Sequence, residues 1–304
     1  MDAKRARQMT IQELKHLFFN RLEQLYPKEE IQSFFNLLIL HRLKLTRADI
    51  ALSPNRIIQK TDEGFFMNSL RELLQEKPIQ YIIGETEFYG LLFKLDKNVL
   101  IPRPETEELV DWILEVRKDQ RFKTQDQGLK ILDIGTGSGC IAVALAKNVS
   151  NATVFAIDVS KQALQIAKQN ALLNEVEINF IECDILNNNV ILSLSKHLSE
   201  SFQFDIIVSN PPYVRELEKQ KIQNNVLENE PHVALFVTNE NPLVFYDRIA
   251  DFAKEYLSEN GHLYLEINQY LGKETTNLLQ QKGFRNVELK KDVLGNDRMI
   301  KAYL

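Results

Sequence analysis

The chain has 304 residues, 44% of them hydrophobic and 26% charged, a composition typical of a globular protein and unlike that of a disordered or membrane-embedded one. No apolar run approaches the ~20 residues needed to cross a bilayer, and the N-terminal residues lack the apolar core of a secretory signal, so we expect a cytoplasmic protein with no membrane contact. The formal net charge of −5 is unevenly placed, because residues 1–60 carry 11 Lys and Arg against 6 Asp and Glu whereas residues 61–304 carry 26 against 36. The excess of Lys and Arg in residues 1–60 can attract an acidic partner, but such residues more often only form the solvent-exposed face of a helix.

Helical periodicity dominates the first 80 residues, and the length of the chain leaves room for a second domain. Thr10 and Glu13 have the spacing of a capping box, directly before apolar residues that recur at helical intervals. The predicted helical segments are residues 11–25, 28–43, 46–52 and 62–75. We therefore predict an N-terminal all-helical domain over residues 1–80.

A connector follows, because aromatic and branched residues alternate with polar ones around Gly84 and Gly90. This pattern predicts a β-hairpin over residues 81–104. From residue 105 onward, predicted helices and strands take turns, which indicates a parallel sheet with crossover helices. The predicted strands are residues 129–135, 153–160, 178–184, 204–210 and 261–268, and the predicted helices between them are 105–116, 139–148, 161–173 and 242–257.

The end of the chain breaks this alternation. Residues 284–293 and 298–304 have no helix between them and should pair antiparallel at the end of the sheet. The second domain, residues 105–304, is therefore predicted to be an α/β domain with a mostly parallel, Rossmann-like sheet and an antiparallel last strand.

A glycine-rich loop follows the first buried strand of this domain. Gly135, Gly137 and Gly139 stand between that strand and a helix, where glycine lets the backbone turn sharply and approach a ligand. A dinucleotide fingerprint would need a glycine where Cys140 stands, and the Gly-Lys-Ser/Thr of a phosphate-binding loop is absent, so pyrophosphate is the weaker candidate. With acidic residues at the strand ends, the loop matches the methyltransferase form of the Rossmann sheet, whose cofactor is S-adenosyl-L-methionine.

Each acidic residue near the loop suits one part of that cofactor. Asp158 can accept both ribose hydroxyls, and Asp133 can face the ammonium group, since charge-assisted hydrogen bonds of this kind are strong. Asp184 stands where an adenine edge is usually read, with Ile185 packing beside it. The loop that leaves room for the methionine part consists of Gly135, Thr136, Gly137, Ser138 and Gly139. The alternative is that the glycines only tighten a turn and the aspartates only cap helices.

The apolar strand FDIIVS ends at the sequence Asn210, Pro211, Pro212 and Tyr213. Proline lacks an N–H and restricts the residue before it, so the chain must leave the sheet here, at the edge where α/β sheets bind ligands. The side-chain oxygen of Asn210 and the main-chain oxygen of Pro211 can together accept both hydrogens of a planar –NH2 group. We therefore predict a catalytic motif over these four residues, with nitrogen as the methyl acceptor and the Tyr213 ring stacked on it.

The four-residue motif alone leaves two acceptors open, the amide of glutamine and the amino group of a base such as adenine. Further segments between residues 78 and 298 resemble the bacterial release factor glutamine methyltransferases: IPRPETE, ILDIGTGSGC, FDIIVSNPPYV, ENEPHVALF, GHLYLEIN and DVLGNDRMI. The resemblance implies a class I methyltransferase fold and methylation of the glutamine in the Gly-Gly-Gln motif of class 1 peptide chain release factors. It also implies that the helical front domain recognises the substrate protein.

The resemblance extends to individual residues. It implies that Asn210 touches the cofactor as well as the glutamine, and that Phe88 and Arg103 shape the substrate pocket or have a purely structural role. Two positions depart from the family pattern, because Ile185 stands where an aromatic residue is common and the Glu266 segment lacks the usual Glu-x-Gly form.

Two rival functions stay open. An adenine-specific DNA or RNA methyltransferase can share the four-residue motif, although the acidic second domain disfavours a long phosphate track, and we expect no direct nucleic-acid partner. The chain could also be a non-catalytic module that only binds the cofactor. Cys140 and Cys183 are expected to be buried thiols and no metal is expected; a monomer is the default.

Overall fold

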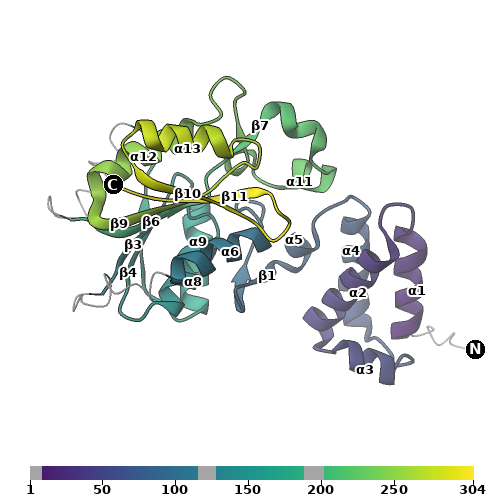
Figure 1. Cartoon of the computed structure of the whole chain (residues 1–304). Coiled ribbons are helices and arrows are strands. Elements are labelled where there is room, and N and C mark those ends of the chain that lie inside the picture. The colour runs from purple at the N-terminus through teal and green to yellow at the C-terminus, as the bar shows by residue number, and fades with distance from the viewer. Residues whose placement is uncertain (1–8, 116–127, 188–201) are drawn as a thin grey trace, which may run out of the picture. The chain divides into compact units, whose positions relative to one another are not determined.

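The computed structural model describes residues 9–115, 128–187 and 202–304 (Figure 1). The chain divides into two compact units. The first consists of Met1–Gly84 together with Asn224–Asn229, and the second consists of Glu85–Gln223 and Glu230–Leu304.

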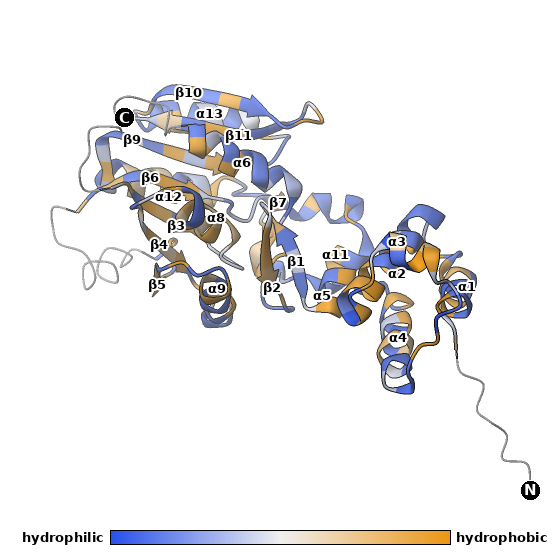
Figure 2. Ribbon diagram, turned by 90° about the horizontal axis from the view of Figure 1, so that it is seen from below, coloured by the Kyte–Doolittle hydropathy of each residue, from blue (hydrophilic) through white to orange (hydrophobic). Residues whose placement is uncertain are grey.

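The first unit is a small helical bundle. Its helices are α1 (Ile11–Leu22), α2 (Lys28–Leu43), α3 (Arg47–Leu52), α4 (Lys60–Leu73), α5 (Ile79–Ile83) and α11 (Asn224–Asn229). The predicted capping box is confirmed, because the Glu13 N–H donates to Thr10 Oγ1 over 3.2 Å and the Thr10 N–H donates to Glu13 Oε2 over 2.9 Å. Helix α1 ends earlier than predicted, since Leu25 is 46% exposed and outside the packed face. The helices carry separate hydrophobic and hydrophilic faces (Figure 2), and their apolar faces meet around Phe18 and Phe35.

The predicted hairpin is present but shorter than expected. It consists of β1 (Glu85–Phe88) and β2 (Leu91–Lys94), joined by Tyr89 and Gly90, which both have positive φ as a two-residue turn requires. Tyr89 is held in this conformation because its N–H donates to Glu107 and its hydroxyl donates to Asp111. Gly84 is not part of the hairpin turn: with φ of 77° it ends helix α5, which stands where an extended segment was expected.

Seven strands of the second unit's described residues form one sheet in the order β10-β11-β9-β6-β3-β4-β5. They are β3 (Lys130–Ile134), β4 (Thr153–Asp158), β5 (Ile178–Glu182), β6 (Phe204–Ser209), β9 (Leu257–Glu266), β10 (Arg285–Lys291) and β11 (Asp297–Tyr303). The pairs within β9-β6-β3-β4-β5 are parallel, and β11 runs antiparallel to both β9 and β10. This sheet confirms the predicted class of fold, mostly parallel with an antiparallel last strand.

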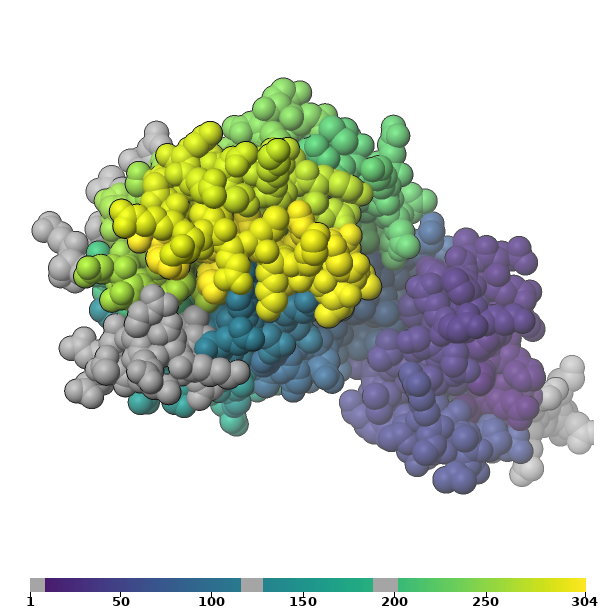
Figure 3. Space-filling model, in the orientation of Figure 1, coloured from purple at the N-terminus to yellow at the C-terminus, as the bar shows by residue number. Residues whose placement is uncertain are grey.

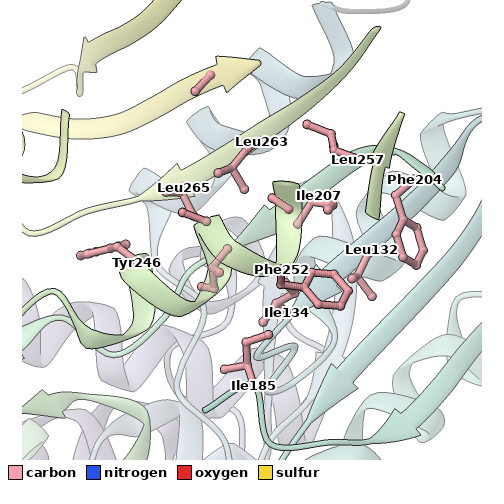
Figure 4. Close-up of a cluster of buried hydrophobic side chains, with 14 of the residues drawn as sticks. Leu132, Ile134, Ile185, Phe204, Ile207, Tyr246, Phe252, Leu257, Leu263 and Leu265 are labelled. Atoms are coloured by element: carbon pink, nitrogen blue, oxygen red, sulfur yellow. The ribbon is translucent and has the colours of Figure 1, made fainter. Parts of the chain in front are cut away.

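Helices cover both faces of the sheet, and alternate residues of each strand enter separate cores. On one face, Leu132 and Ile134 of β3 pack with α12 (Val244–Tyr256) and α13 (Gly272–Gln281), as Figure 4 shows around Tyr246 and Phe252. On the other face, Ile131 packs with α6 (Pro104–Glu115) and α8 (Cys140–Asn148), and α9 (Lys161–Leu173) lies beside them.

The region after β9 differs most from the sequence expectation. Helix α13 was not predicted, and β9 begins at Leu257 rather than at residue 261 because the polar SEN segment extends the strand. Figure 3 shows the end of the chain, in yellow, gathered at one surface of the second unit. The remaining short elements, between β6 and α12, are β7 (Val214–Arg215), η2 (Glu216–Lys221), η3 (His232–Ala234) and β8 (Phe236–Val237), with β7 pairing parallel to β8.

Candidate active site

A cleft of about 290 Å³ opens where β3, β4, β5 and β6 end. The strand order reverses at β3, since β4 and β5 lie to one side of it and β6 and β9 to the other. In open α/β sheets ligands bind at this edge and at this reversal. The predicted residues that line the cleft are Arg103, Gly135, Thr136, Gly137, Ser138, Asp158, Asp184, Ile185, Asn210, Pro211 and Pro212. Four further predicted residues lie outside its lining: Phe88, Asp133, Gly139 and Tyr213.

The glycines of the loop have two different roles, one beside the cleft and one in helix packing. All three glycines have positive φ, with values of 72° at Gly135, 54° at Gly137 and 81° at Gly139. A Cβ added at Gly135 or Gly137 would meet nothing within 4 Å, so these positions leave open space beside the cleft. A Cβ at Gly139 would lie 3.0 Å from the Cβ of Ala167 in α9, and this glycine therefore permits the close packing of α8 on α9.

Asp133 lies beneath the loop and is fully buried. Its Oδ2 accepts a hydrogen bond from Thr136 Oγ1 at 2.6 Å, which ties the loop to the end of β3, while its Oδ1 has no hydrogen-bond partner in the described part of the chain. Burial raises the pKa of this carboxyl to about 7. An unsatisfied buried carboxylate oxygen is costly, so the site favours a donor or a cation that reaches it.

Asp158 ends β4 and faces the cleft with acceptor capacity to spare. Its Oδ2 accepts the Gly137 N–H at 2.9 Å and its Oδ1 accepts the Ser160 N–H at 2.8 Å. Each carboxylate oxygen carries two lone pairs, so one on each oxygen stays available for a pair of hydroxyl donors. Burial raises the pKa of Asp158, and the hydrogen bonds from Ser160 and Gly137 oppose that rise.

The third strand contributes one polar and one apolar residue to the cleft. Asp184 is exposed, and its Oδ1 accepts the Leu186 N–H at 2.9 Å, which shapes the turn after β5. Ile185 is buried and provides an apolar wall. Both residues line the cleft at the position where the sequence pattern predicts adenine.

Asn210 follows β6 directly and is half-buried at the edge of the cleft. The end of β6 is fixed to the end of β3 because Ser209 Oγ donates to the Ile134 carbonyl at 2.7 Å. The two prolines then carry the chain out of the sheet, as expected. In the sheet, β6 lies on one side of β3, and β4 and β5 lie on the other. The part of the cleft next to β6 is therefore lined by Asn210, Pro211 and Pro212.

Tyr213 is not part of the cleft lining. Its hydroxyl donates to Glu266 Oε1 at 2.9 Å, and its main-chain carbonyl accepts from Asn268 Nδ2 at 2.9 Å. Burial raises the pKa of Tyr213, and the nearby Glu266 charge raises it further. The hydroxyl is therefore a hydrogen-bond donor at neutral pH, and the side chain packs against the buried cluster that includes α12. Stacking of the ring on the substrate stays a prediction.

Thr106 is a functional candidate that the sequence did not single out, and Glu266 was noted there only because its segment departs from the family pattern. Thr106 Oγ1 donates to Glu266 Oε2 at 2.6 Å and accepts from Asn210 Nδ2 at 3.2 Å. The register of β6 on β9 pairs Ser209 with Leu265, so Asn210 and Glu266 leave neighbouring strands at the same level. Glu266 could have been identified from the sequence because it is an acidic residue at the end of a buried strand. Thr106 could have been identified because it belongs to the IPRPETE segment.

Arg103 reaches the cleft, whereas Phe88 does not. Arg103 Nη2 lies 2.7 Å from Oε1 of the buried Glu230, which holds the guanidinium at the cleft wall. Phe88 is buried in the hairpin, where its ring packs edge-on against Phe93 at 6.0 Å between centroids. Its position supports the structural alternative given for it above.

Both cysteines are buried free thiols, as expected, and burial raises the pKa of Cys140 to about 12 and that of Cys183 to about 11. Among the described residues, no group of three or more His, Cys, Asp or Glu side chains could hold a metal ion. No helix in the same ranges combines the length and the apolar character needed to cross a membrane.

Two family models match the chain. The model of the methyltransferase small domain matches residues 120–235, and the model of the PrmC N-terminal domain matches residues 13–84. The second match lies within the first unit, and the first match lies on the second unit apart from Asn224–Asn229.

Similar proteins cover nearly the whole chain. A protein of Flavobacterium psychrophilum described as a release factor glutamine methyltransferase is 52% identical over 294 residues, which cover 97% of this chain and 99% of that protein. One of Bacteroides thetaiotaomicron with the same description is 40% identical over 281 residues, covering 92% and 95% of the two chains. A solved structure of a release factor-specific protein-(glutamine-N5) methyltransferase from Alicyclobacillus acidocaldarius is 27% identical, with a TM-score of 0.42, and covers 69% of this chain and 98% of that one.

Proposed function

The chain belongs to the release factor glutamine methyltransferases, and from this membership and the geometry of the cleft we propose its reaction. It transfers a methyl group from S-adenosyl-L-methionine to the side-chain nitrogen of the glutamine in the Gly-Gly-Gln motif of class 1 peptide chain release factors. The observation that carries the proposal is the position of Asn210, half-buried at the end of β6 and lining the same cleft as the glycine loop.

The residues at the ends of β3, β4 and β5 fit the cofactor. Asp158 has one free lone pair on each carboxylate oxygen, which suits the two ribose hydroxyls. The open space at Gly135 and Gly137 suits the methionine part, and the unsatisfied Oδ1 of Asp133 provides negative charge beneath it for the ammonium group. Ile185 forms the apolar wall for adenine. When bound, S-adenosyl-L-methionine supplies an electrophilic methyl group on a sulfonium.

The Asn210 oxygen and the Pro211 carbonyl provide the acceptor site for the glutamine amide. Both oxygens accept hydrogens of the –NH2 group, which turns the nitrogen and directs its lone pair toward the cofactor side of the cleft. As the bond from the nitrogen to the methyl carbon formed, the bond from that carbon to the sulfonium sulfur would break, and its electron pair would stay on sulfur. The Asn210 and Pro211 oxygens would stabilise the positive charge that the nitrogen gains. The nitrogen would then release a proton to solvent, and because this proton becomes acidic only as the methyl arrives, a strong general base is not required.

We also propose that the first unit, predicted over residues 1–80, recognises the release factor. The excess of Lys and Arg in residues 1–60 supports this role, because it provides a surface for acidic segments of a partner protein. The acidic composition of residues 61–304 supports a protein substrate rather than a long nucleic-acid track.

Mass spectrometry of release factor peptides before and after incubation with the enzyme and cofactor tests the proposal. We expect the mass of one added methyl group on the glutamine of the Gly-Gly-Gln peptide. Radioactive methyl transfer offered to release factor, DNA and RNA side by side gives the decisive comparison. Label in DNA or RNA and none in the release factor would contradict the proposed acceptor, and no label in any of the three would favour a binding module.

A further inference from the structure

A hydrogen-bonded chain of four side chains connects the acceptor site with the interior of the second unit. Asn210 Nδ2 donates to Thr106 Oγ1 at 3.2 Å, and Thr106 Oγ1 donates to Glu266 Oε2 at 2.6 Å. The other carboxylate oxygen, Oε1, accepts from the Tyr213 hydroxyl at 2.9 Å. The four residues come from the end of β6 and the segment after it, the first turn of α6, and the end of β9.

Glu266 is the centre of this chain and is almost fully buried, with 1% exposure. Burial raises its pKa, while the hydroxyls of Thr106 and Tyr213 and the charge of Arg298 oppose the rise. A carboxylate in the interior is tolerated when both oxygens accept hydrogen bonds, and here each oxygen has a hydroxyl donor. The arrangement of two donors around an acceptor fits the ionised form of Glu266.

The direction of the hydrogen bonds follows from the single hydrogen of the Thr106 hydroxyl. Because that hydrogen is directed to Glu266, Thr106 Oγ1 can only accept on its other side. The group of Asn210 that faces Thr106 must therefore be the donor, Nδ2. The amide oxygen Oδ1 is then left for the cleft, which Asn210 lines.

This direction matters because an asparagine amide has nearly the same shape in both orientations. If the amide were turned by half a rotation, its –NH2 would face the –NH2 of the substrate, and one of the two acceptors would be lost. A donor facing a donor leaves both without a partner and does not stabilise positive charge on the acceptor nitrogen.

We propose that Thr106 and Glu266 are positioning residues that fix the Asn210 amide with its oxygen toward the methyl acceptor. Neither touches the reacting atoms; Glu266 sets the direction of the Thr106 hydroxyl, and Thr106 sets the orientation of Asn210. The inference rests on the proposed function, since it concerns the same acceptor site.

The experiment compares the two ways of changing Thr106. Thr106→Val removes the hydroxyl and keeps the shape, whereas Thr106→Ser keeps the hydroxyl. We expect Thr106→Val to lower kcat about 10–100-fold, with the Kd for cofactor and the KM for release factor within about twofold of wild type. Thr106→Ser should recover most of the rate, because the hydrogen bonds to Glu266 and Asn210 are retained.

Thr275→Val is the matched control. Thr275 is also fully buried, and its hydroxyl donates at 2.8 Å to the carbonyl of Leu271, the residue that precedes α13. Neither residue belongs to the hydrogen-bonded chain from Asn210 to Tyr213. This variant loses a comparable buried hydrogen bond, so we expect a similar loss of stability and an unchanged kcat. A kcat that falls equally in Thr275→Val and Thr106→Val would overturn the proposal, as would a rate in Thr106→Ser as low as in Thr106→Val.

Glu266→Gln tests the direction of the chain without changing its shape. The new amide can donate to Thr106 Oγ1, which releases the threonine hydrogen to face Asn210 and favours the turned amide. We expect kcat to fall about 10–100-fold with the fold preserved. Retention of the wild-type kcat would contradict a role for the carboxylate.

Nuclear magnetic resonance of the Asn210 side-chain amide gives a measurement independent of turnover. In the enzyme without substrate, the Asn210 –NH2 signals should shift in Thr106→Val and Glu266→Gln and stay near the wild-type position in Thr106→Ser. Unchanged signals in the first two variants would overturn the proposal. If the wild-type enzyme does not methylate release factor, the proposed function fails, while these signals still report whether Thr106 orients Asn210.

Discussion

The two halves of the cleft are built in different ways. The cofactor half, at the ends of β3, β4 and β5, consists of a backbone turn and carboxylates that still have free lone pairs. The acceptor half, around Asn210, is a directed chain of side-chain hydrogen bonds that ends on the buried Glu266. A substitution in the cofactor half removes one contact with the cofactor. A substitution in the acceptor half also alters the orientation of the neighbouring side chain in the hydrogen-bonded chain. Binding and turnover should therefore respond to different substitutions.

Asn210→Ala should produce the largest effect and separates the two halves most clearly. Loss of the amide removes one of the two acceptors for the substrate –NH2, so we expect kcat to fall about 10³-fold. The cofactor Kd, measured by calorimetry, should stay within about threefold, because the glycine loop and Asp158 are untouched. Normal turnover in this variant would show that Asn210 has no role in the reaction, and it would contradict the proposed difference between the two halves of the cleft.

Asp158→Ala should have the opposite signature. Hydrogen bonds to a charged group contribute about 1.5–3 kcal/mol each, so loss of both ribose contacts should raise the cofactor Kd more than about 100-fold in calorimetry. At saturating cofactor, kcat should change far less. Glu182→Ala is the control, since Glu182 is an exposed carboxylate at the neighbouring position of β5 and does not line the cleft. Equal loss of affinity in both variants would argue for a general charge effect instead of a ribose contact.

Gly139→Ala and Gly137→Ala test whether the two glycines of the loop have different roles, one in packing and one in cofactor binding. At Gly139 the added Cβ would meet Ala167 at 3.0 Å and the residue would keep a positive φ, so we expect a loss of about 2–3 kcal/mol in unfolding free energy. At Gly137 the Cβ enters open space, so the loss of stability should be only about 1 kcal/mol while the cofactor affinity falls. Urea unfolding and calorimetry on both variants measure the difference. The division fails if Gly139→Ala leaves stability intact and weakens only cofactor binding.

Asp133 predicts a smaller, pH-dependent effect in the protein without cofactor. Burial raises its pKa from 3.8 to about 7, so the folded state binds a proton more tightly than the unfolded state between those values. The free energy of unfolding should therefore fall as pH rises through this window and level off above it, by on the order of 2–3 kcal/mol between pH 5 and about pH 7. Asp133→Asn should flatten that dependence in urea titrations from about pH 5 to pH 8. An identical pH dependence in the variant would show that another group is responsible.

Much of the cofactor half could be predicted because its residues are close in sequence. The loop between Gly135 and Gly139 directly follows a strand, and local glycine and strand patterns identify both. What the pattern could not distinguish is the environment of each glycine, since the contact of Gly139 with Ala167 depends on how two helices pack.

The acceptor half was predicted only in part, because it is assembled from distant positions. The NPPY motif is contiguous, but Thr106 is 104 positions from Asn210 and 160 from Glu266. Only the parallel register of β6 on β9 brings the ends of these strands together. For the same reason, the sequence did not indicate that the Tyr213 hydroxyl has Glu266 as its partner.

The fold was predicted wherever periodicity was strong. Helix α13 was missed because its buried positions include Gly272 and Thr275, which weaken the apolar signal. The helix α5 was missed because it is five residues long and Gly84 suits a turn as well as a helix end.

The order of the strands has a consequence for synthesis on the ribosome. Strand β11 is made after every other strand of the described sheet, yet it lies between β9 and β10 rather than at the rim. Until β11 has emerged, β9 lacks one neighbour and Arg298, whose charge acts on Glu266, has not been translated. The strands that carry the cofactor half of the cleft are therefore synthesised before the strand that completes the surroundings of Glu266.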